Sequence, residues 1–212
     1  MARPRSRALT ITAALAFVVF AVLAILVAVN PEPFGLDRDA ARAARAVRTD
    51  GVTSVMRAVS LLGSFPSISI QIAVIGGAIL LIRREAYPGL WLLAAALGAW
   101  SMSNGFKALL DRPRPEPGLI DAGGAAFPSG HATQGGAYFV MLGVILASAL
   151  PRPWRLPAAW LAVALGVLSG LSRIYLGVHW VTDVIGGFAL GVAWSCALLA
   201  VRRTMAAAAT VD

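Results

Sequence analysis

Three short polar segments between residues 107 and 183 contain the side chains of this chain that are best suited to chemistry. They hold both of its histidines and its only lysine, in a sequence that is otherwise mostly apolar. A phosphoryl group carries negative charge on its non-bridging oxygens, and cations with aimed N–H or O–H donors stabilise that charge in the transition state. The pattern therefore indicates phosphoryl transfer. The candidate residues are Lys107 and Arg114, then Ser129, Gly130 and His131, then Arg173, His179 and Asp183.

The two histidines suit a division of labour that needs no metal ion. One imidazole could attack phosphorus while the other protonates the departing oxygen. No cluster of carboxylates or cysteines offers ligands at metal spacing, and Cys196 is the single cysteine. A lone cysteine excludes an intramolecular disulfide and a multi-cysteine metal site. We therefore expect neither a metal nor another cofactor.

The composition is that of a membrane protein. Hydrophobic residues make up 58% of the 212 residues and charged residues only 13%, with a mean hydropathy of +0.77. A soluble globular domain falls far outside these values. The net charge of +8 and the pI near 11.2 could suggest nucleic acid as a partner. The arginines are scattered among apolar runs and form no basic face, so we expect no nucleic-acid binding.

Six apolar stretches come near the length of about 20 residues that a membrane-spanning helix needs. We therefore predict an all-α, polytopic membrane protein with six transmembrane helices, in which residues 1–212 form one membrane-embedded domain. The predicted spans are Leu9 to Val29, Ser67 to Ile82, Gly89 to Phe106, Ala132 to Leu150, Leu156 to Leu171 and Val178 to Val201.

A long polar segment separates the first two predicted spans. Its arginines recur every three or four residues between Asp37 and Arg48. That spacing predicts a short helix along the membrane surface, with a basic stripe toward water or lipid headgroups. A solvated helix that merely bridges two spans is an open alternative.

Charge and position together suggest an orientation. Arg3, Arg5 and Arg7 precede the first span, which lacks a clear cleavage site and is interpreted as an uncleaved anchor. Basic residues divide evenly between the two sides, but those on the side of the N-terminus flank spans in short loops. We therefore expect a multi-pass protein of the cell membrane with both termini in the cytoplasm.

The predicted spans bring all three polar segments to one membrane surface. Lys107 and Arg114 lie at the end of the third span and in the loop after it, and His131 opens the fourth. Arg173 ends the fifth span, and His179 begins the sixth. Each of these residues could have a purely structural role alone, for example as an interfacial anchor. Their convergence at the outer face favours a single site. Asp183, one turn beyond His179, shares its helix face.

The motifs resemble the three-part signature of the type 2 phosphatidic acid phosphatase superfamily. Its first part matches Lys107, six further residues and Arg114-Pro115. Its second matches residues 128–131, Pro-Ser-Gly-His, and its third matches Ser172-Arg173, five further residues, His179, three further residues and Asp183. No signature position departs from the pattern, and residues 107–183 form the motif core of the predicted phosphatase domain.

The resemblance implies a role for each site residue. His179 would attack phosphorus and become a phosphohistidine, with Asp183 orienting its imidazole. His131 would protonate the leaving lipid oxygen and then activate water. The remaining residues would bind the phosphoryl oxygens, and they are Lys107, Arg114, Arg173, the Ser129 hydroxyl and the backbone N–H of Gly130.

These roles predict a metal-independent phosphatase that removes the terminal phosphate of a membrane lipid phosphate or diphosphate. An outer-facing site in a compact chain favours a polyprenyl diphosphate, such as undecaprenyl diphosphate, over phosphatidic acid or phosphatidylglycerophosphate. A non-catalytic lipid-phosphate binding or transport protein is the alternative, although binding alone requires no nucleophile and acid. Vanadium-dependent haloperoxidases share such a site but are soluble. The sequence leaves the oligomeric state open.

Overall fold

The computed structural model describes the fold of residues 4–208 and the side chains of residues 7–205. This part of the chain is helical and contains no β-strand, which confirms the predicted all-α class. The helices are α1 (Pro4–Val29), α2 (Gly35–Ala46), α3 (Asp50–Leu62), α4 (Phe65–Arg83), α5 (Tyr87–Leu110), α6 (Gly130–Gln134), the π-helical turn η1 (Gly135–Phe139), α7 (Val140–Ala149), α8 (Arg152–Tyr175) and α9 (Val181–Ala208).

Five stretches of the described chain are helical, long and apolar enough to cross a membrane. They lie in α1, in α4, in the continuous run from α6 to α7, in α8 and in α9. All six predicted spans are helical, but α5 is not among these five. Its 24 residues include Ser101, Ser103, Asn104 and Lys107, which lower its hydropathy.

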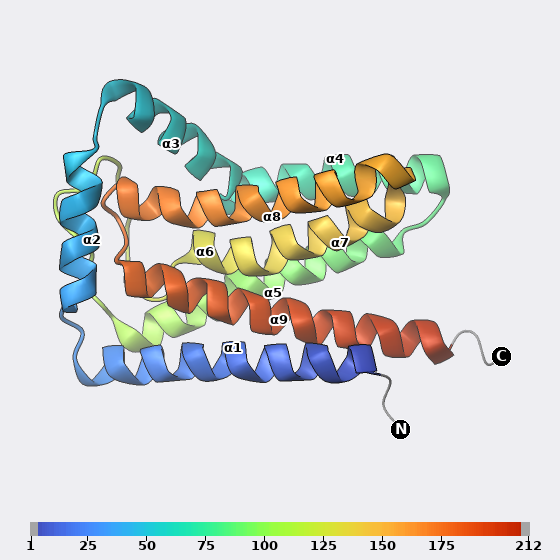
Figure 1. The fold of residues 1–212 in the computed structure, drawn as a ribbon, viewed down its shortest axis with the longest axis horizontal. Helices are drawn as coiled ribbons and strands as arrows, with labels where there is room; N and C mark the ends of the chain where they lie inside the picture. Colours follow the sequence, from blue (N-terminus) through green and yellow to red (C-terminus); the bar gives the residue numbers. More distant parts are fainter. Residues whose placement is uncertain (1–3, 209–212) are drawn as a thin grey trace.

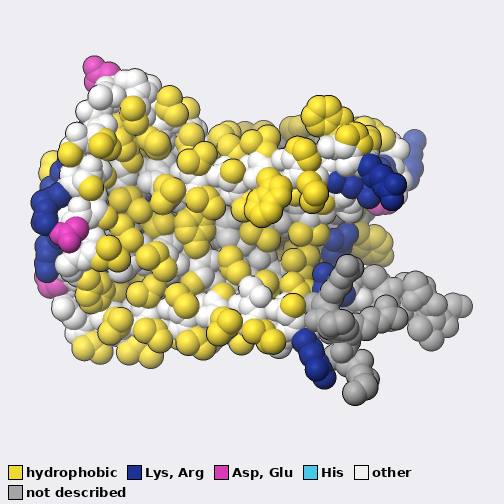
Figure 2. Space-filling view, viewed as in Figure 1, with side chains coloured by type: hydrophobic (Ala, Val, Ile, Leu, Met, Phe, Trp, Pro, Cys, Tyr) yellow, Lys and Arg dark blue, Asp and Glu magenta, His cyan; other side chains and the backbone are white. Residues whose placement is uncertain are grey.

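The long helices run side by side, and both the first turn of α1 and the last turn of α9 lie at the end opposite α2 (Figure 1). Hydrophobic side chains cover the visible surface between two ends that carry the Lys and Arg side chains (Figure 2). On α1, Leu15, Phe17 and Ile25 are more than half exposed. An apolar band between charged ends is the surface that a bilayer requires.

Two helices, rather than the single one expected, connect α1 to α4. Thr49 separates them because its Oγ1 accepts a hydrogen bond from the Val52 N–H at 3.3 Å and so caps α3. The sequence predicted that the basic stripe of this segment faces water or lipid headgroups, and the structure differs in part. Arg45 and Arg48 do not point only toward water or headgroups, because they donate to the carbonyls of Glu116 and Tyr175. Arg45 therefore fastens α2 to the loop at Glu116, and Arg48, just after α2, binds the C-terminal end of α8.

Helix α9 packs backbone against backbone on the helix that opens with the Ser-Gly-His segment. A Cβ atom at Gly191 would lie 2.2 Å from the Thr133 carbonyl oxygen, and one at Gly187 would lie 2.5 Å from that of Ser129. Gly187 and Gly191 therefore permit this close contact, because only glycine fits at these distances. It brings the start of α6 beside the start of α9.

Candidate active site

The three polar segments meet at one end of the helix bundle, as the sequence predicts. Lys107 is near the C-terminal end of α5 and Arg173 near that of α8, whereas His131 is in the first turn of α6. His179 and Asp183 flank the start of α9. The imidazole of His131 is within electrostatic reach of Arg173, His179 and Lys107. In Figure 1 these helix ends all lie on the side of the bundle that α2 covers.

His179 and Asp183 form a buried pair. The imidazole Nδ1 lies 3.4 Å from Oδ2 of Asp183, and both side chains are almost fully shielded from solvent. The same Oδ2 accepts a hydrogen bond from the Trp180 N–H at 2.8 Å, which ties the carboxylate to the first turn of α9. Asp183 thus faces the nitrogen of His179 that points away from Arg114.

The opposite ring nitrogen of His179 faces a cation. Nη1 of Arg114 lies 3.1 Å from Nε2, and because a guanidinium can only donate, Nε2 must be the unprotonated nitrogen. Burial, followed by the charges of Lys107, Arg114 and Arg173, lowers the pKa of His179 well below its ordinary value. At neutral pH the imidazole is therefore uncharged, and its lone pair is on Nε2, where it accepts the hydrogen bond from Arg114.

Lys107 and Arg114 hold the loop that leads to the Ser-Gly-His segment. Nζ of Lys107 donates to the Ala125 carbonyl at 2.6 Å. Arg114 donates to the carbonyls of Gly123, Gly124 and Ala125 at 3.0, 2.9 and 3.2 Å, and to that of Val178 at 2.6 Å. The two cations therefore cross-link the loop before α6, and Arg114 also ties it to the turn that carries His179.

The start of α6 carries hydrogen-bond donors beside Asp183. Ser129 is fully buried, its backbone N–H donates to the Asp183 carbonyl at 3.0 Å, and its Oγ has no partner within the described part of the chain. The first N–H groups of a helix have no partner inside it, so those of Gly130 and His131 can bind an anion. No neighbouring side chain forces glycine at position 130, where a Cβ would have only Ser103 Oγ nearby, at 3.7 Å.

Arg173 is held by a residue that the sequence analysis did not single out. Its Nη1 donates to Ser60 Oγ at 2.6 Å, and both side chains are buried. Its Nε has no partner in the described residues and remains available to a ligand oxygen. A serine in a short polar helix 113 positions away gives no local signal of such a contact.

Arg112 is a second functional candidate that sequence reasoning missed. It is 1% exposed, and its guanidinium contacts both Asp183 and Asp37, the latter from α2. The sequence offered one signal, since Arg112 stands two residues before the signature residue Arg114.

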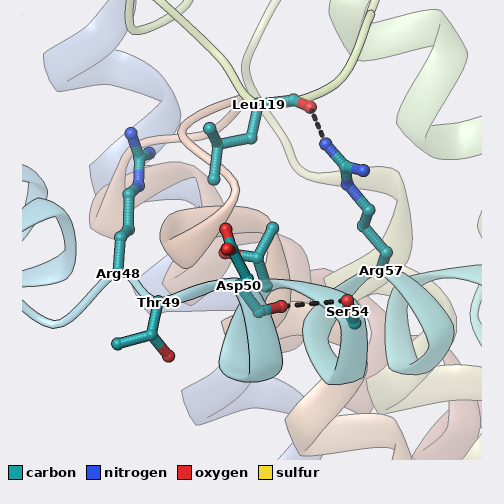
Figure 3. A pocket seen from close by; sticks show the side chains of 7 residues that line it. Arg48, Thr49, Asp50, Ser54, Arg57 and Leu119 are labelled. Carbon is teal, nitrogen blue, oxygen red and sulfur yellow. Dashed lines mark hydrogen bonds between the residues drawn. The ribbon is translucent and has the colours of Figure 1, made fainter.

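A cavity of 310 Å³ opens on the surface beside α3, apart from the histidines. Figure 3 shows Arg48 and Arg57 on its two sides, with Arg57 donating to the Leu119 carbonyl. Arg48 donates to the Tyr175 carbonyl at 3.0 Å. Arg57 is exposed, and none of the eight candidate site residues lines this cavity.

The described residues contain no group of three or more His, Cys, Asp or Glu side chains that could hold a metal ion. Cations instead surround His179, with Lys107, Arg114 and Arg173 as its charged neighbours. That donor set fits an anionic phosphate better than it fits a metal. Metal independence itself stays a prediction.

Comparison with known families agrees with this geometry. The model of the PAP2 superfamily matches residues 88–206, which is more than half of the chain and includes all eight candidate site residues. The chain belongs to the PAP2 superfamily. The resemblance drawn from the three motifs is therefore confirmed.

Similar proteins of this superfamily are named as lipid phosphatases. Over 179 residues the chain is 31% identical to phosphatidylglycerophosphatase B of Bacillus subtilis, covering 83% of this chain and 87% of that protein. It is 37% identical to decaprenylphosphoryl-5-phosphoribose phosphatase of Mycobacterium tuberculosis, over 54% of this chain and 61% of that one.

A solved structure has the same fold. The crystal structure of a transmembrane PAP2-type phosphatidylglycerolphosphate phosphatase from Bacillus subtilis superposes with a TM-score of 0.81 at 28% identity. The match covers 91% of this chain and 96% of that one. Together with the apolar helices, it shows that the chain is a multi-pass membrane protein.

Proposed function

We propose that this protein is a lipid phosphatase that hydrolyses the terminal phosphate of a membrane lipid through a phosphohistidine on His179. One observation carries the proposal. The Nε2 lone pair of His179 faces Arg114, while Nδ1 faces Asp183, so the imidazole is oriented and uncharged among cations. A neutral, oriented imidazole beside phosphate-binding cations is what nucleophilic attack on phosphorus requires.

The first half-reaction follows from the placement of the two histidines. Nε2 of His179 attacks phosphorus, the bond between phosphorus and the lipid oxygen breaks, and the lipid oxygen takes a proton from the His131 imidazolium. His131 takes up that proton when the anionic phosphate binds beside it. The imidazole of His179 then carries the phosphoryl group on Nε2 and a proton on Nδ1. The Asp183 carboxylate stabilises that positive ring.

The second half-reaction returns the enzyme to its starting state. His131, now neutral, accepts a proton from water, and the water oxygen attacks the phosphoryl group of phospho-His179. The bond between Nε2 and phosphorus breaks and inorganic phosphate leaves. Lys107, Arg114 and Arg173 offset the phosphoryl charge in both steps, with the Ser129 hydroxyl and the Gly130 N–H as further donors.

The lipid itself is the finer part of the proposal. The name of the Bacillus relative favours phosphatidylglycerophosphate, whereas an outer-facing site in a compact chain favours a polyprenyl diphosphate such as undecaprenyl diphosphate. Both lipids present a terminal phosphoryl group that three cations can bind, so electrostatics alone does not separate them. We place phosphatidylglycerophosphate first, because the similarity to that relative extends over most of both chains.

A substrate panel tests the function. Release of inorganic phosphate from phosphatidylglycerophosphate, phosphatidic acid and undecaprenyl diphosphate is measured in mixed micelles with excess chelator, for the wild-type protein and for His179→Ala. We expect release by the wild type alone. Wild-type protein that binds these lipids but releases no phosphate would support the alternative of a binding or transport protein. Activity that requires Mg²⁺ would exclude the metal-independent mechanism.

The topology is a further part of the proposal. We propose that α5 is the sixth span, because it has 24 residues and packs beside α4 and α9. We also propose that the termini are cytoplasmic and that the site faces outward. After Cys196→Ala, a single cysteine is introduced at Ala122 or at Ala86. An impermeant thiol reagent should label position 122 in intact cells, and labelling at position 86 instead would invert the orientation.

A further inference from the structure

Arg112 occupies the centre of a buried network that reaches from the surface helix α2 to the catalytic pair. Nη1 donates to Asp183 Oδ1 at 2.5 Å and to Thr182 Oγ1 at 2.7 Å. Nη2 donates to Asp37 Oδ2 at 2.7 Å, and Nε donates to the Pro31 carbonyl at 3.2 Å. The guanidinium thus binds two carboxylates from different helices, and its donors point at protein groups.

Asp37 is as completely committed to this network as Arg112. Its Oδ1 accepts hydrogen bonds from the backbone N–H and the hydroxyl of Thr182, each at 2.9 Å. Its Oδ2 accepts the bond from Arg112 and another from the Phe34 N–H at 3.1 Å. The side chains of Asp37, Arg112 and Asp183 are all 0% exposed. Asp37 therefore faces the protein interior, although most residues of α2 are exposed or partly exposed.

We propose that Arg112 and Asp37 are positioning residues of the catalytic centre that act on His179 through Asp183. This inference rests on the proposed function. Arg112 binds Oδ1 of Asp183 and thereby fixes the rotation of the carboxylate, so that Oδ2 faces Nδ1 of His179. The planar fork of a guanidinium can bind both carboxylates in fixed directions, which an ammonium group cannot do.

Asp37 compensates the positive charge that Arg112 brings to Asp183. A single cation bound to Asp183 would cancel the negative charge that stabilises the phosphorylated imidazole. Because Asp37 shares the same guanidinium, the two carboxylates and one cation keep a net charge of −1. Arg112 can then orient Asp183 without neutralising its effect on His179. Charge effects of this kind are strong in a site closed to water.

This arrangement predicts opposite effects for the two charges. Asp37→Asn makes the trio neutral, which destabilises the imidazolium form of His179. Arg112→Gln leaves two carboxylates and a net charge of −2, which stabilises that form. The double variant Asp37→Asn/Arg112→Gln returns the trio to −1. The groups that face His179 from the surrounding elements are unchanged in all three variants, and they are Lys107, Arg114, His131, Arg173 and Asp183 itself.

The test is the pH dependence of kcat/KM for phosphate release from phosphatidylglycerophosphate in mixed micelles. The ionisation of the substrate is the same for every variant, so differences in the acid limb of the profile report on the enzyme. We expect Asp37→Asn to lower kcat at least tenfold with KM within threefold, and to move the acid limb to lower pH. Arg112→Gln should move it to higher pH. The double variant should return the limb to the wild-type position.

Asp39→Asn is the matched control. It makes the same chemical change two positions along the same helix, where the side chain is 67% exposed and pairs with exposed Arg42. We expect wild-type kinetics from this variant. Thermal unfolding of each purified protein in detergent accompanies the kinetics.

Several results would overturn the inference. One such result is that the losses in kcat/KM of the two single variants add in the double variant while the acid limb shifts in none of them. A network with a purely structural role would behave in this way. Another is wild-type kinetics for Asp37→Asn. A third is failure of all three variants to fold while Asp39→Asn folds, because the network would then serve folding alone. If the wild-type protein releases no phosphate from any lipid, the proposed function fails instead.

Discussion

The two charged ends of the helix bundle use arginine in different ways. At the end opposite the site, Arg83 and Arg155 are exposed. They donate to the carbonyls of Ala149 and Leu150, respectively, at the C-terminal end of α7. At the site end, Arg112 and Arg173 are buried, and their partners come from helices distant in the sequence. Both ends carry basic side chains that fit a membrane interface, but Arg112 and Arg173 at the site end are removed from water.

Burial away from water distinguishes the arginines of the site from the exposed arginines at the opposite end. An exposed guanidinium is screened by water and salt, so its charge affects a neighbour only weakly. A buried one acts strongly on nearby ionisable groups and must be compensated by carboxylates or by ligand oxygens. At the site end, Asp37 and Asp183 compensate Arg112, whereas Arg173 keeps an unpartnered Nε within the described structure. The difference predicts which substitutions affect catalysis.

Replacement of His179 should have the largest effect. His179→Ala removes the imidazole that lies between Arg114 and Asp183, so turnover should fall to background, because no nucleophile then remains at that position. The measurement is phosphate release together with trapping of the acid-labile phosphoenzyme. Near-normal turnover by a correctly folded His179→Ala protein would assign the nucleophile elsewhere.

Replacement of His131 should be the next largest. The lipid oxygen must then leave without a proton, so His131→Ala should lower kcat by about 10²- to 10⁴-fold. Phosphoenzyme formation should be slow but detectable in a single turnover. A lipid analogue with a better leaving group should recover much of the loss, and the absence of any recovery would contradict the assignment of His131 as the general acid.

Replacement of Lys107 tests whether a cation of the site controls the pKa of His179. Burial is the main cause that lowers the pKa of His179, and the charge of Lys107 lowers it further. Removing that charge in Lys107→Met should raise the pKa of His179, so the acid limb of kcat/KM should move to higher pH. Lys107→Arg keeps the charge and should stay near the wild type. An acid limb of Lys107→Met that stays at the wild-type pH, or moves to lower pH, would refute the electrostatic effect.

Replacement of Arg83 should have the smallest effect and defines the other side of the comparison. Its guanidinium is exposed at the opposite end and contacts a backbone carbonyl. Arg83→Gln should change kcat/KM by less than about twofold, because surface substitutions away from the site have little energetic effect. A tenfold loss at constant protein stability would show that the two ends of the bundle are coupled.

Much of the fold could be predicted because a bilayer imposes simple rules. Backbone polar groups in lipid must be satisfied within a helix, so apolar stretches predicted all six long helical segments. The region between the first two spans was harder, because short amphipathic helices lack a length rule. Thr49 is a helix cap that could have indicated the break between α2 and α3. Polar residues in the second half of α5 lower its hydropathy, and α5 is therefore not among the five candidate spans despite its length.

The chain by itself determined the chemistry. The motif residues, their spacing and their positions at span ends specified phosphoryl transfer, the superfamily and the residues that meet at one face, since helix periodicity and membrane thickness leave little freedom. Tertiary packing decided how those residues are held. Ser60 reaches Arg173 and Asp37 reaches Arg112 across 113 and 75 positions, and no local pattern encodes such contacts. They depend on where α2 and α3 dock, which is set by the closure of the whole bundle.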